Sequence, residues 1–370
     1  MPAPSAIVGV ATSIAAFVGW ASAGPADSPV QVLSWADYAR VFGGLDGGEL
    51  GYAVQAFFQN GGGQAWIVRA GAATPEGLIG QADAHTGLCA LDQVDLFNLL
   101  CLPDLRTLDA GTYQRVAAAA TACCVRRRAL ALLDPPSSVA KGDFDAALAW
   151  ITAFPGSLAA AAANAAAYWP EPLVADPMNQ NAPRQIASSG CVAGICAATD
   201  AAVGVWKAPA GTLAQLFGVL DLAVHLDDDQ DGRINPLGLN ALRTFPVYGT
   251  VVWGARTLDG ADLKASDWTY VPVRRLALYI EESLSRGLGW TVFEPNGPAL
   301  WSAIGQATSV FMKDLQSQGA FYNYSVRCDA STTTPQDIET GVVNLVVELA
   351  PVKPAEFIVI ELQLIVASSD

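Results

Sequence analysis

The run Val94-Asp95-Leu96-Phe97-Asn98-Leu99-Leu100-Cys101-Leu102, closed by Pro103-Asp104, decides the fold class of this chain. An alanine-rich helical pattern follows at Thr112–Val125, and a second apolar run, Ala129–Leu133, ends at Asp134-Pro135-Pro136. Continuous apolar runs that alternate with helical patterns are typical of strands buried on both faces. The sequence therefore predicts an α/β domain with a mainly parallel sheet covered by helices.

The same alternation extends over residues 71–255, which we expect to form this α/β domain. Its other predicted elements are helices at Phe144–Phe154 and Leu158–Ala167, a short strand at Leu173–Ala175, a helix at Ser188–Ala202 and a strand at Val247–Trp253. Residues 1–70 are expected as an N-terminal segment. Its predicted elements are a short strand at Ala6–Val10, a helix at Tyr52–Phe58 and a strand at Ala65–Arg69.

Residues 256–354 show an α+β pattern and are expected as a C-terminal domain. The predicted elements are a strand-like start that becomes a helix at Val273–Arg286, a strand at Trp290–Phe293, an amphipathic helix at Pro298–Gln318, and strands at Phe321–Cys328 and Val342–Ala350.

A clean strand pattern occupies Phe357–Val366, after the stiff spacer Pro351-Val352-Lys353-Pro354. The apolar residues singled out as arm contacts are Phe357, Ile358, Val359, Ile360, Leu362, Leu364 and Val366, and Ile365 is apolar as well. A long apolar strand at a free terminus promotes aggregation unless it is paired. Two pairings stay open on physical grounds: with Val342–Ala350 of the same chain, or with a neighbouring copy that receives residues 355–370 as a donated arm.

Composition narrows the class of protein. Charged residues are 15% of the 370 residues and hydrophobic residues 52%, which excludes a disordered chain and indicates a surface largely buried against partners. The net charge of -15 argues against nucleic-acid binding. We interpret the basic run Arg126-Arg127-Arg128 as the end of a helix, where positive charges interact favourably with the helix dipole. We expect a soluble protein made in the cytoplasm, without membrane insertion, because no apolar run appears long enough to span a bilayer.

Catalytic signatures are weak. Ser188, Ser189 and Cys191 lie near a predicted helix start, and a Cys191–His225 pair is conceivable, but the flanking residues match no nucleophile motif. The seven cysteines form no CxxC pair and there are two histidines, so a zinc site is not expected. We predict neither an enzyme nor a cofactor, and keep a hydrolase as the competing hypothesis.

An acidic run offers one weak metal candidate. Asp227, Asp229 and Asp231, with Gly232, match the first half of a calcium-binding loop. The position that needs a bidentate glutamate is Gly238, and Pro236 interrupts the helix that should follow. A solvated acidic turn is the favoured interpretation.

Several further runs carry a family resemblance. They are Val8–Gly19, Phe57-Phe58-Gln59-Asn60-Gly61-Gly62, Ile234–Asn240, Val252–Leu258, Arg274-Arg275-Leu276, Phe293-Glu294-Pro295-Asn296 and Ala350–Phe357. These runs resemble contractile tail sheath proteins, as found in phage tails, R-type bacteriocins and extracellular contractile injection systems. They cover about the first seventy residues and most of those after 230, in the family's order.

The resemblance implies a structural subunit that polymerises as hexameric rings around an inner tube and contracts to drive the tube through a target envelope. It implies a subtilisin-like shape for residues 71–255, a sheath core built from residues 1–70 and 256–354, and a donated arm at 355–370. The implied partners are other copies, the inner tube, baseplate and terminator proteins, and sheath paralogues, in a phage tail-like particle assembled in the cytoplasm.

Two departures from the family pattern matter. The chain begins at Met1-Pro2-Ala3-Pro4, so an N-terminal arm is nearly absent, which keeps open a minor or terminal sheath paralogue that caps or adapts a sheath of another protein. The helix Pro298–Gln318 resembles the tube-facing helix of the family, with Trp301, Gln306 and Lys313 as candidate contacts. Lys313 is its one basic residue, so charge-based attachment to the tube is expected to be weak.

Overall fold

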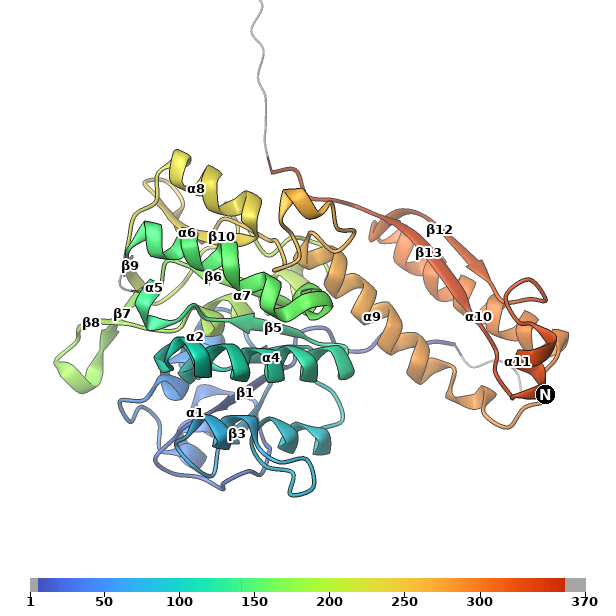
Figure 1. Cartoon of the computed structure of the whole chain (residues 1–370), viewed down its shortest axis with the longest axis horizontal. Coiled ribbons are helices and arrows are strands. Elements are labelled where there is room, and N and C mark those ends of the chain that lie inside the picture. The colour runs from blue at the N-terminus through green and yellow to red at the C-terminus, as the bar shows by residue number, and fades with distance from the viewer. Residues whose placement is uncertain (1–5, 141, 357–370) are drawn as a thin grey trace, which may run out of the picture.

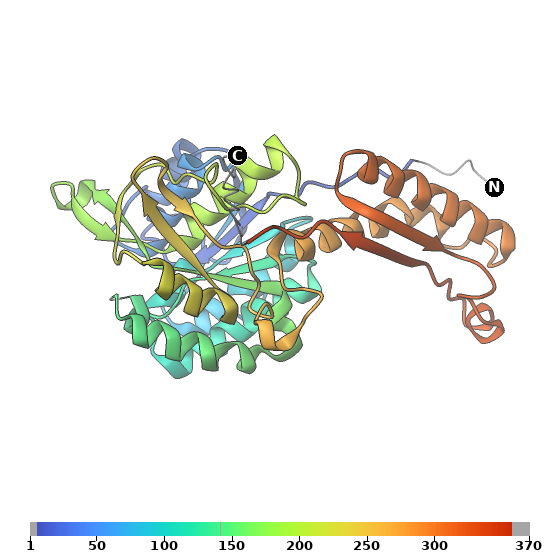
Figure 2. The ribbon, with the colours of Figure 1, turned by 90° about the horizontal axis from the view of Figure 1, so that it is seen from above.

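The computed structural model describes residues 6–140 and 142–356, which form two lobes (Figures 1 and 2). A large α/β lobe holds the chain up to about residue 270. An elongated C-terminal lobe extends from it and consists of α9 (Val271–Gly287), α10 (Pro298–Ser317), β12 (Phe321–Arg327), α11 (Pro335–Glu339) and β13 (Val346–Pro351). The predicted arm, Phe357–Val366, lies outside the described residues.

A mixed eight-stranded sheet forms the centre of the α/β lobe. Its spatial order is β11 (Gly249–Val252), β10 (Leu239–Phe245), β6 (Ala165–Trp169), β5 (Leu130–Leu133), β4 (Leu99–Cys101), β1 (Ala15–Gly19), β3 (Ala65–Arg69) and β2 (Val30–Val32). The six inner strands pair in parallel, while β2 and β11 pair antiparallel at the two edges. The α/β class and the mainly parallel sheet are confirmed, with antiparallel edges.

Helices cover both faces of this sheet, which explains the continuous apolar runs. In β1, Ala16 and Val18 face one buried cluster, and Ala15 and Phe17 face the other. The first cluster includes residues of α3 (Pro75–Ile79), α4 (Ala110–Arg126), α5 (Ser137–Ala140), α6 (Phe144–Ala153) and α8 (Asp228–Ile234). The second includes residues of α1 (Trp35–Phe42), α2 (Glu49–Gln59) and α7 (Ser188–Ala202).

Two glycines let α7 lie close against α2. A Cβ atom on Gly190 would lie 2.2 Å from the Ala53 carbonyl oxygen, and one on Gly194 would lie 2.6 Å from the Phe57 carbonyl oxygen. Any larger side chain at these positions would force the helices apart. The small-residue helix predicted at Ser188–Ala202 is confirmed with the same bounds, and its small residues serve this contact.

Two predictions in the α/β lobe were wrong. Residues Ala6–Val10 form no strand, and the central strand β1 follows at Ala15–Gly19 instead. The predicted helix Leu158–Ala167 is a 3-10 segment, Phe154–Asn164, followed by strand β6. Alanine favours helices in isolation, but tertiary context overrides this preference where small side chains fit between two helical layers. The predicted strand Val94–Leu102 shortens to Leu99–Cys101.

The C-terminal predictions were partly right. The amphipathic helix is confirmed as α10, and the two strands pair antiparallel as β12 and β13. The strand-like start at Val273 was wrong, because α9 is helical from Val271, with Pro272 in its first turn. The predicted strand Trp290–Phe293 was also wrong, since Gly289–Thr291 form a 3-10 turn between α9 and α10.

A separate three-stranded antiparallel sheet stands beside the large one. It has the order β8 (Ala182–Gln185), β7 (Pro172–Asp176) and β9 (Val219–Leu222), so the strand predicted at Leu173–Ala175 is confirmed but lies outside the main sheet. The β7–β8 hairpin projects from the α/β lobe (Figure 1).

By length and apolar composition, Phe144–Asn164 could span a membrane, with a mean hydropathy of 1.5, contrary to our expectation of no such segment. This segment joins α6 to the 3-10 run and is broken at Ala159, where φ is +50°. Ala147, Ile151 and Leu158 are buried in the core of the α/β lobe. These residues pack on the sheet, and 39% of the apolar window is buried.

The N-terminal segment contributes to both lobes. Strands β1 to β3 lie in the same sheet as the strands of residues 71–255. Residues 6–14 lie along α9, where the Val10 amide donates to Ser283 Oγ at 3.1 Å and Ile7 packs against Gly287. Residues 6–70 therefore link the α/β lobe to the C-terminal lobe.

Candidate assembly surfaces

The β12–β13 ribbon has two free edges among the described residues. Tyr324 pairs with Leu349 and Val326 with Val347, and these four side chains pack over the cluster that α9 and α10 share. A two-stranded sheet is marginally stable alone, and an unpaired strand edge can accept a further strand. The ribbon is therefore a surface to which strands of other chains can add.

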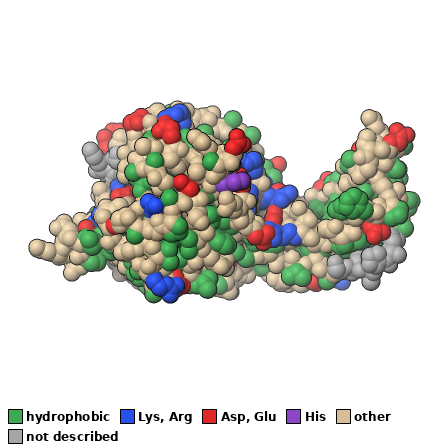
Figure 3. Space-filling model, turned by 90° about the horizontal axis from the view of Figure 1, so that it is seen from below, with side chains coloured by type: hydrophobic (Ala, Val, Ile, Leu, Met, Phe, Trp, Pro, Cys, Tyr) green, Lys and Arg blue, Asp and Glu red, His purple; other side chains and the backbone are tan. Residues whose placement is uncertain are grey.

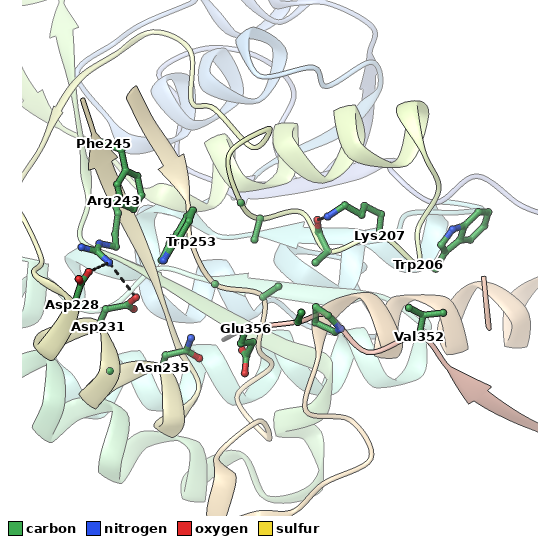
Figure 4. A pocket seen from close by; sticks show the side chains of 18 residues that line it. Trp206, Lys207, Asp228, Asp231, Asn235, Arg243, Phe245, Trp253, Val352 and Glu356 are labelled. Carbon is green, nitrogen blue, oxygen red and sulfur yellow. Dashed lines mark hydrogen bonds and ion pairs between the residues drawn. The ribbon is translucent and has the colours of Figure 1, made fainter. Parts of the chain in front are cut away.

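The chain leaves this ribbon as an extended segment, residues 352–356, which we call the arm root. The arm root runs from the C-terminal lobe back to the α/β lobe and lines a cavity of about 510 Å³ (Figure 4). Trp206, Arg243 and Trp253 are among the residues on the other walls. The last described residue, Glu356, points toward the α/β lobe.

A buried arginine holds the arm root. Arg256 Nε donates to Glu356 Oε1 at 2.9 Å, its second terminal nitrogen binds the other carboxylate oxygen, and Tyr270 Oη lies 3.2 Å from Glu356 Oε2. Arg256 also donates to Asp262 Oδ1 at 2.6 Å. Burial lowers the pKa of Arg256, but the two carboxylates outweigh it and raise this pKa, so the guanidinium stays charged. The arm root, residues 352–356, is thereby fixed to the α/β lobe.

A second buried ion pair joins the lobes. Arg275, on α9, donates to Asp200 Oδ1 at 3.0 Å and to Asp200 Oδ2 at 2.6 Å, and both side chains are under 5% exposed. Arg275 also donates to the Thr12 carbonyl at 2.9 Å, while the Thr12 hydroxyl donates to Asp200 at 2.6 Å. Three segments, from the N-terminus, α7 and α9, therefore meet at one charged group.

The tube-facing prediction needs one correction. Trp301 is only 5% exposed and its indole N–H donates to Asn296 Oδ1 at 2.8 Å, so it is a packing residue of α10. Gln306 and Lys313 do lie on the exposed face of α10. Asp314 follows Lys313 and is also exposed, which leaves this face without net charge.

The acidic run forms a helix start instead of a metal loop. Asp227 caps α8, accepting from the Gln230 amide at 2.8 Å in a reciprocal capping box. Asp231 lies 3.6 Å from Arg243, and burial raises the pKa of Asp231 to about 6. Asp229 lies in the first turn of the same helix. Within the described residues, no group of three or more His, Cys, Asp or Glu side chains could hold a metal ion.

The candidate nucleophiles are structural. Ser188 Oγ donates to Asp134 Oδ1 at 3.0 Å, and the Ser189 amide donates to the same oxygen at 2.8 Å. Cys191 is fully buried, and burial raises the pKa of its thiol to about 12. His225 is exposed and contacts Asp221 at 3.0 Å. Ser188 and Ser189 therefore bind a buried carboxylate in the core, and Cys191 is a buried, protonated thiol.

The crevice where α/β enzymes bind ligands is closed by ion pairs. It lies at the carboxyl ends of the strands where their order reverses, here between β1 and β4. Asp104, after β4, accepts from the Trp20 amide, after β1, at 2.7 Å. Arg106 binds Glu171 through two nitrogens and Glu49 at 3.1 Å. These side chains bind one another at the position where a ligand would enter.

Asp104 makes subunit stability depend on pH. Burial raises the pKa of Asp104 to about 7, and the charges of Glu49 and Asp46 add to this. The folded chain thus holds a proton that the unfolded chain releases near pH 4, so this stabilisation is complete below pH 4 and is lost as pH rises through 7. Replacing Asp104 by Asn is expected to raise the free energy of unfolding at pH 8.5 by about 2 to 4 kcal/mol and to change little at pH 4.

Urea unfolding of both proteins at pH 4, 6 and 8.5 measures this difference. The control is Asp109→Asn, since the exposed Asp109 caps α4 and asparagine caps equally well. An Asp104→Asn variant with the wild-type pH profile would contradict the assignment of the proton to Asp104.

Comparison with known proteins identifies the family. The model of the phage tail sheath protein central domain matches residues 77–258, and that of the phage tail sheath C-terminal domain matches residues 264–365. This chain belongs to the phage tail sheath family. A prophage major tail sheath protein from Pseudomonas aeruginosa (strain UCBPP-PA14) is 29% identical to our sheath protein over 91% of this chain and 85% of its own length.

Solved sheath structures match the whole sheath protein. The helical sheath of the anti-feeding prophage in its contracted state is 29% identical, with a TM-score of 0.77 over 97% of this chain and 95% of that one. The PVC sheath of an extracellular contractile injection system, also contracted, is 27% identical, with a TM-score of 0.77 over 98% and 95%. The relatives are structural proteins, which confirms that this sheath protein is a structural subunit and not an enzyme.

Sequence reasoning missed the residues that hold the sheath protein together. Arg256, Arg275 and Glu356 fall in runs quoted for the resemblance, but no role was assigned to them. A usable signal existed, because an arginine inside an apolar helix of a chain with 15% charged residues needs a buried acidic partner. The identity of that partner, 75 or 100 residues away, had no local signal.

Proposed function

We propose that this sheath protein polymerises as hexameric rings around an inner tube and contracts to drive the tube through a target envelope. The observation that carries the proposal is the full-length likeness to two contracted sheath structures. The charge-poor surface supports it, because charged side chains form small separate groups on the face in Figure 3. A surface of this kind suits burial against other subunits.

Residues 355–370 would act as an arm donated to a neighbouring copy. The free edges of the β12–β13 ribbon support this role, since they provide main-chain groups for an added strand. The arm root supports it too, because the Arg256–Glu356 pair holds the start of the arm at a defined place. A strand that joins two copies would keep them connected while their other contacts change during contraction.

The proposed organisation follows from this role. Residues 256–354, with a contribution from 1–70, would form the sheath core, and residues 71–255 a domain of subtilisin-like shape. The proposed partners are other copies, the inner tube, and baseplate and terminator proteins of a phage tail-like particle assembled in the cytoplasm. A relative of this chain occurs in the anti-feeding prophage baseplate structure, which supports the baseplate contact.

Electron microscopy of the purified chain tests this proposal. We expect helical tubes or stacked rings at high protein concentration, and their loss in a variant that ends at Lys353. A variant with Phe357, Ile360 and Leu364 all replaced by Ser keeps the length of the chain and serves as a second arm variant. Monomers in the wild type that join tubes made by a full sheath protein would instead indicate a minor paralogue.

A further inference from the structure

The arm root covers one side of the cavity of about 510 Å³. In Figure 4, Asp231 and Asn235, from α8 and the residue after it, lie on the opposite side from Val352 of the arm root. Phe245 and Trp253 also line the cavity and contact each other, with ring centroids 4.6 Å apart. A volume of about 300 to 1,000 Å³ with aromatic side chains in the wall is typical of sites that bind a ligand. The cavity therefore has the size and the lining of a site for apolar groups.

Two oxygen atoms of the residues in this wall lack a hydrogen-bond donor. Asp231 and Asn235 are each 9% exposed, and the Oδ1 atom of each has no hydrogen-bond partner within residues 6–140 and 142–356. The other carboxylate oxygen of Asp231 lies 3.6 Å from Arg243. A buried acceptor without a donor is unfavourable, so such an atom usually marks the place of a missing partner. The main-chain amides of an extended segment are donors of the kind that this wall lacks.

The chain itself continues from the wall of the cavity. Glu356 lines the cavity and is held there by Arg256, whose Nε donates to Glu356 Oε1 at 2.9 Å. Beyond the described residues the sequence continues with Phe357-Ile358-Val359-Ile360. Four extended residues span roughly 14 Å. The first apolar residues of the arm are therefore tethered within reach of the cavity.

Tethering favours this segment over any other occupant. A site beside a short tether meets its ligand at an effective concentration in the millimolar range, far above the concentration of a second chain in a dilute solution of free subunits. Burial of apolar side chains supplies the driving force. A free subunit also needs such shelter, because an unpaired apolar strand promotes aggregation.

We propose that, in the free subunit, this cavity holds the first apolar residues of the same chain's arm, residues 357–360. Their side chains would pack against Phe245 and Trp253, and their amides would face Asp231 and Asn235. The contact would shelter the arm before a neighbouring copy receives it. That role in assembly rests on the proposed function, whereas occupation of the cavity can be tested on the free subunit alone.

Disulfide trapping in a dilute solution of the free subunit tests the contact. The variant carries Ala210→Cys in the cavity wall and Ile358→Cys in the arm, together with Cys89→Ser, since Cys89 is half-buried and the other six cysteines are buried. A disulfide needs Cα atoms within about 7 Å of each other. We therefore expect the internal disulfide to form at least tenfold faster than in the matched control with Leu213→Cys, an exposed position outside the cavity. Equal rates would overturn the proposal. Disulfide-linked dimers would show that the arm of another copy enters the cavity, and the proposal would be wrong.

A substitution that fills the cavity gives a second measurement, without added cysteines. Ala210→Phe should raise the hydroxyl-radical reactivity of Phe357 in the free subunit at least fivefold, because the new ring takes the space of the arm. Leu213→Phe is the matched control and should leave this reactivity unchanged. The same reactivity in Ala210→Phe as in the wild type would contradict occupation of the cavity. Neither measurement involves polymerisation, so a failure here leaves the sheath function intact.

Discussion

Replacing Arg275 by Met is expected to lower the free energy of unfolding by about 3 to 5 kcal/mol, the usual cost of removing one partner of a buried ion pair. The carboxylate of Asp200, 4% exposed, would lose its cation and keep only the Thr12 hydroxyl among its present partners. Burial makes an unpaired charge expensive, because no water replaces the lost partner. The contact between α9, α7 and the N-terminal segment would weaken at the same time.

Urea unfolding of the full chain, followed by circular dichroism, measures this loss. Arg40→Met is the matched control, since Arg40 is 74% exposed in its pair with Asp37 and should cost less than 1 kcal/mol. A double variant, Arg275→Met with Asp200→Asn, should recover part of the stability, because it leaves no buried charge. If Arg275→Met alone lowers the free energy of unfolding by less than 1 kcal/mol, the pair does not stabilise the contact between α9, α7 and the N-terminal segment.

Replacing Glu356 by Ala is expected to free the arm root. Arg256 would keep its ion pair with Asp262, so its charge would not be left unpaired. We expect the free energy of unfolding to fall by about 1.5 to 3 kcal/mol, the usual contribution of the charged hydrogen bonds removed. Because a tenfold change corresponds to 1.4 kcal/mol, the state in which the arm root is detached from Arg256 should become at least tenfold more populated. The concentration needed for polymerisation should rise, since the arm would no longer start from a fixed place.

Urea unfolding of the full chain, together with sedimentation of polymers, tests this prediction. The control is Glu348→Ala on β13, whose pair with Arg327 is 62% and 52% exposed and should contribute little. An unchanged free energy of unfolding would argue that the Arg256–Glu356 pair does not hold the arm root. A lower free energy of unfolding with normal polymerisation would show that this pair stabilises the subunit but is not needed for assembly.

Local signals were strong where the sequence predicted elements well. Ser188–Ala202 and Ala65–Arg69 have the predicted bounds. Ser188–Ala202 is a run of small residues without proline, and Ala65–Arg69 is a short run rich in strand-forming residues after a glycine turn. Ala15–Gly19 and Ala165–Trp169 were missed, since short alanine-containing runs have little strand preference of their own. They become strands because small side chains fit the centre of a sheet that is covered on both faces.

The candidate site residues also differ in how far local sequence signals could place them. Gln306 and Lys313 lie on the exposed face of α10, where helical periodicity puts them, and their contact with the tube stays a prediction. Trp301 is buried on the apolar stripe of α10, three residues before Ile304, so the same periodicity would have assigned it to the core. Asp227 resembled a calcium ligand in its spacing, yet it caps α8, because a carboxylate before a helix satisfies free backbone amides.

The sequence by itself determined the fold class, the sheath family and the charge-poor character of the surface, because these depend on composition, periodicity and runs of neighbouring residues. Only the tertiary structure decided which charges are buried together, as in Arg275 with Asp200 and Arg256 with Glu356. It also decided that the arm root and α8 enclose a cavity. These properties depend on which distant segments exclude water from a side chain, and that is settled when the lobes pack.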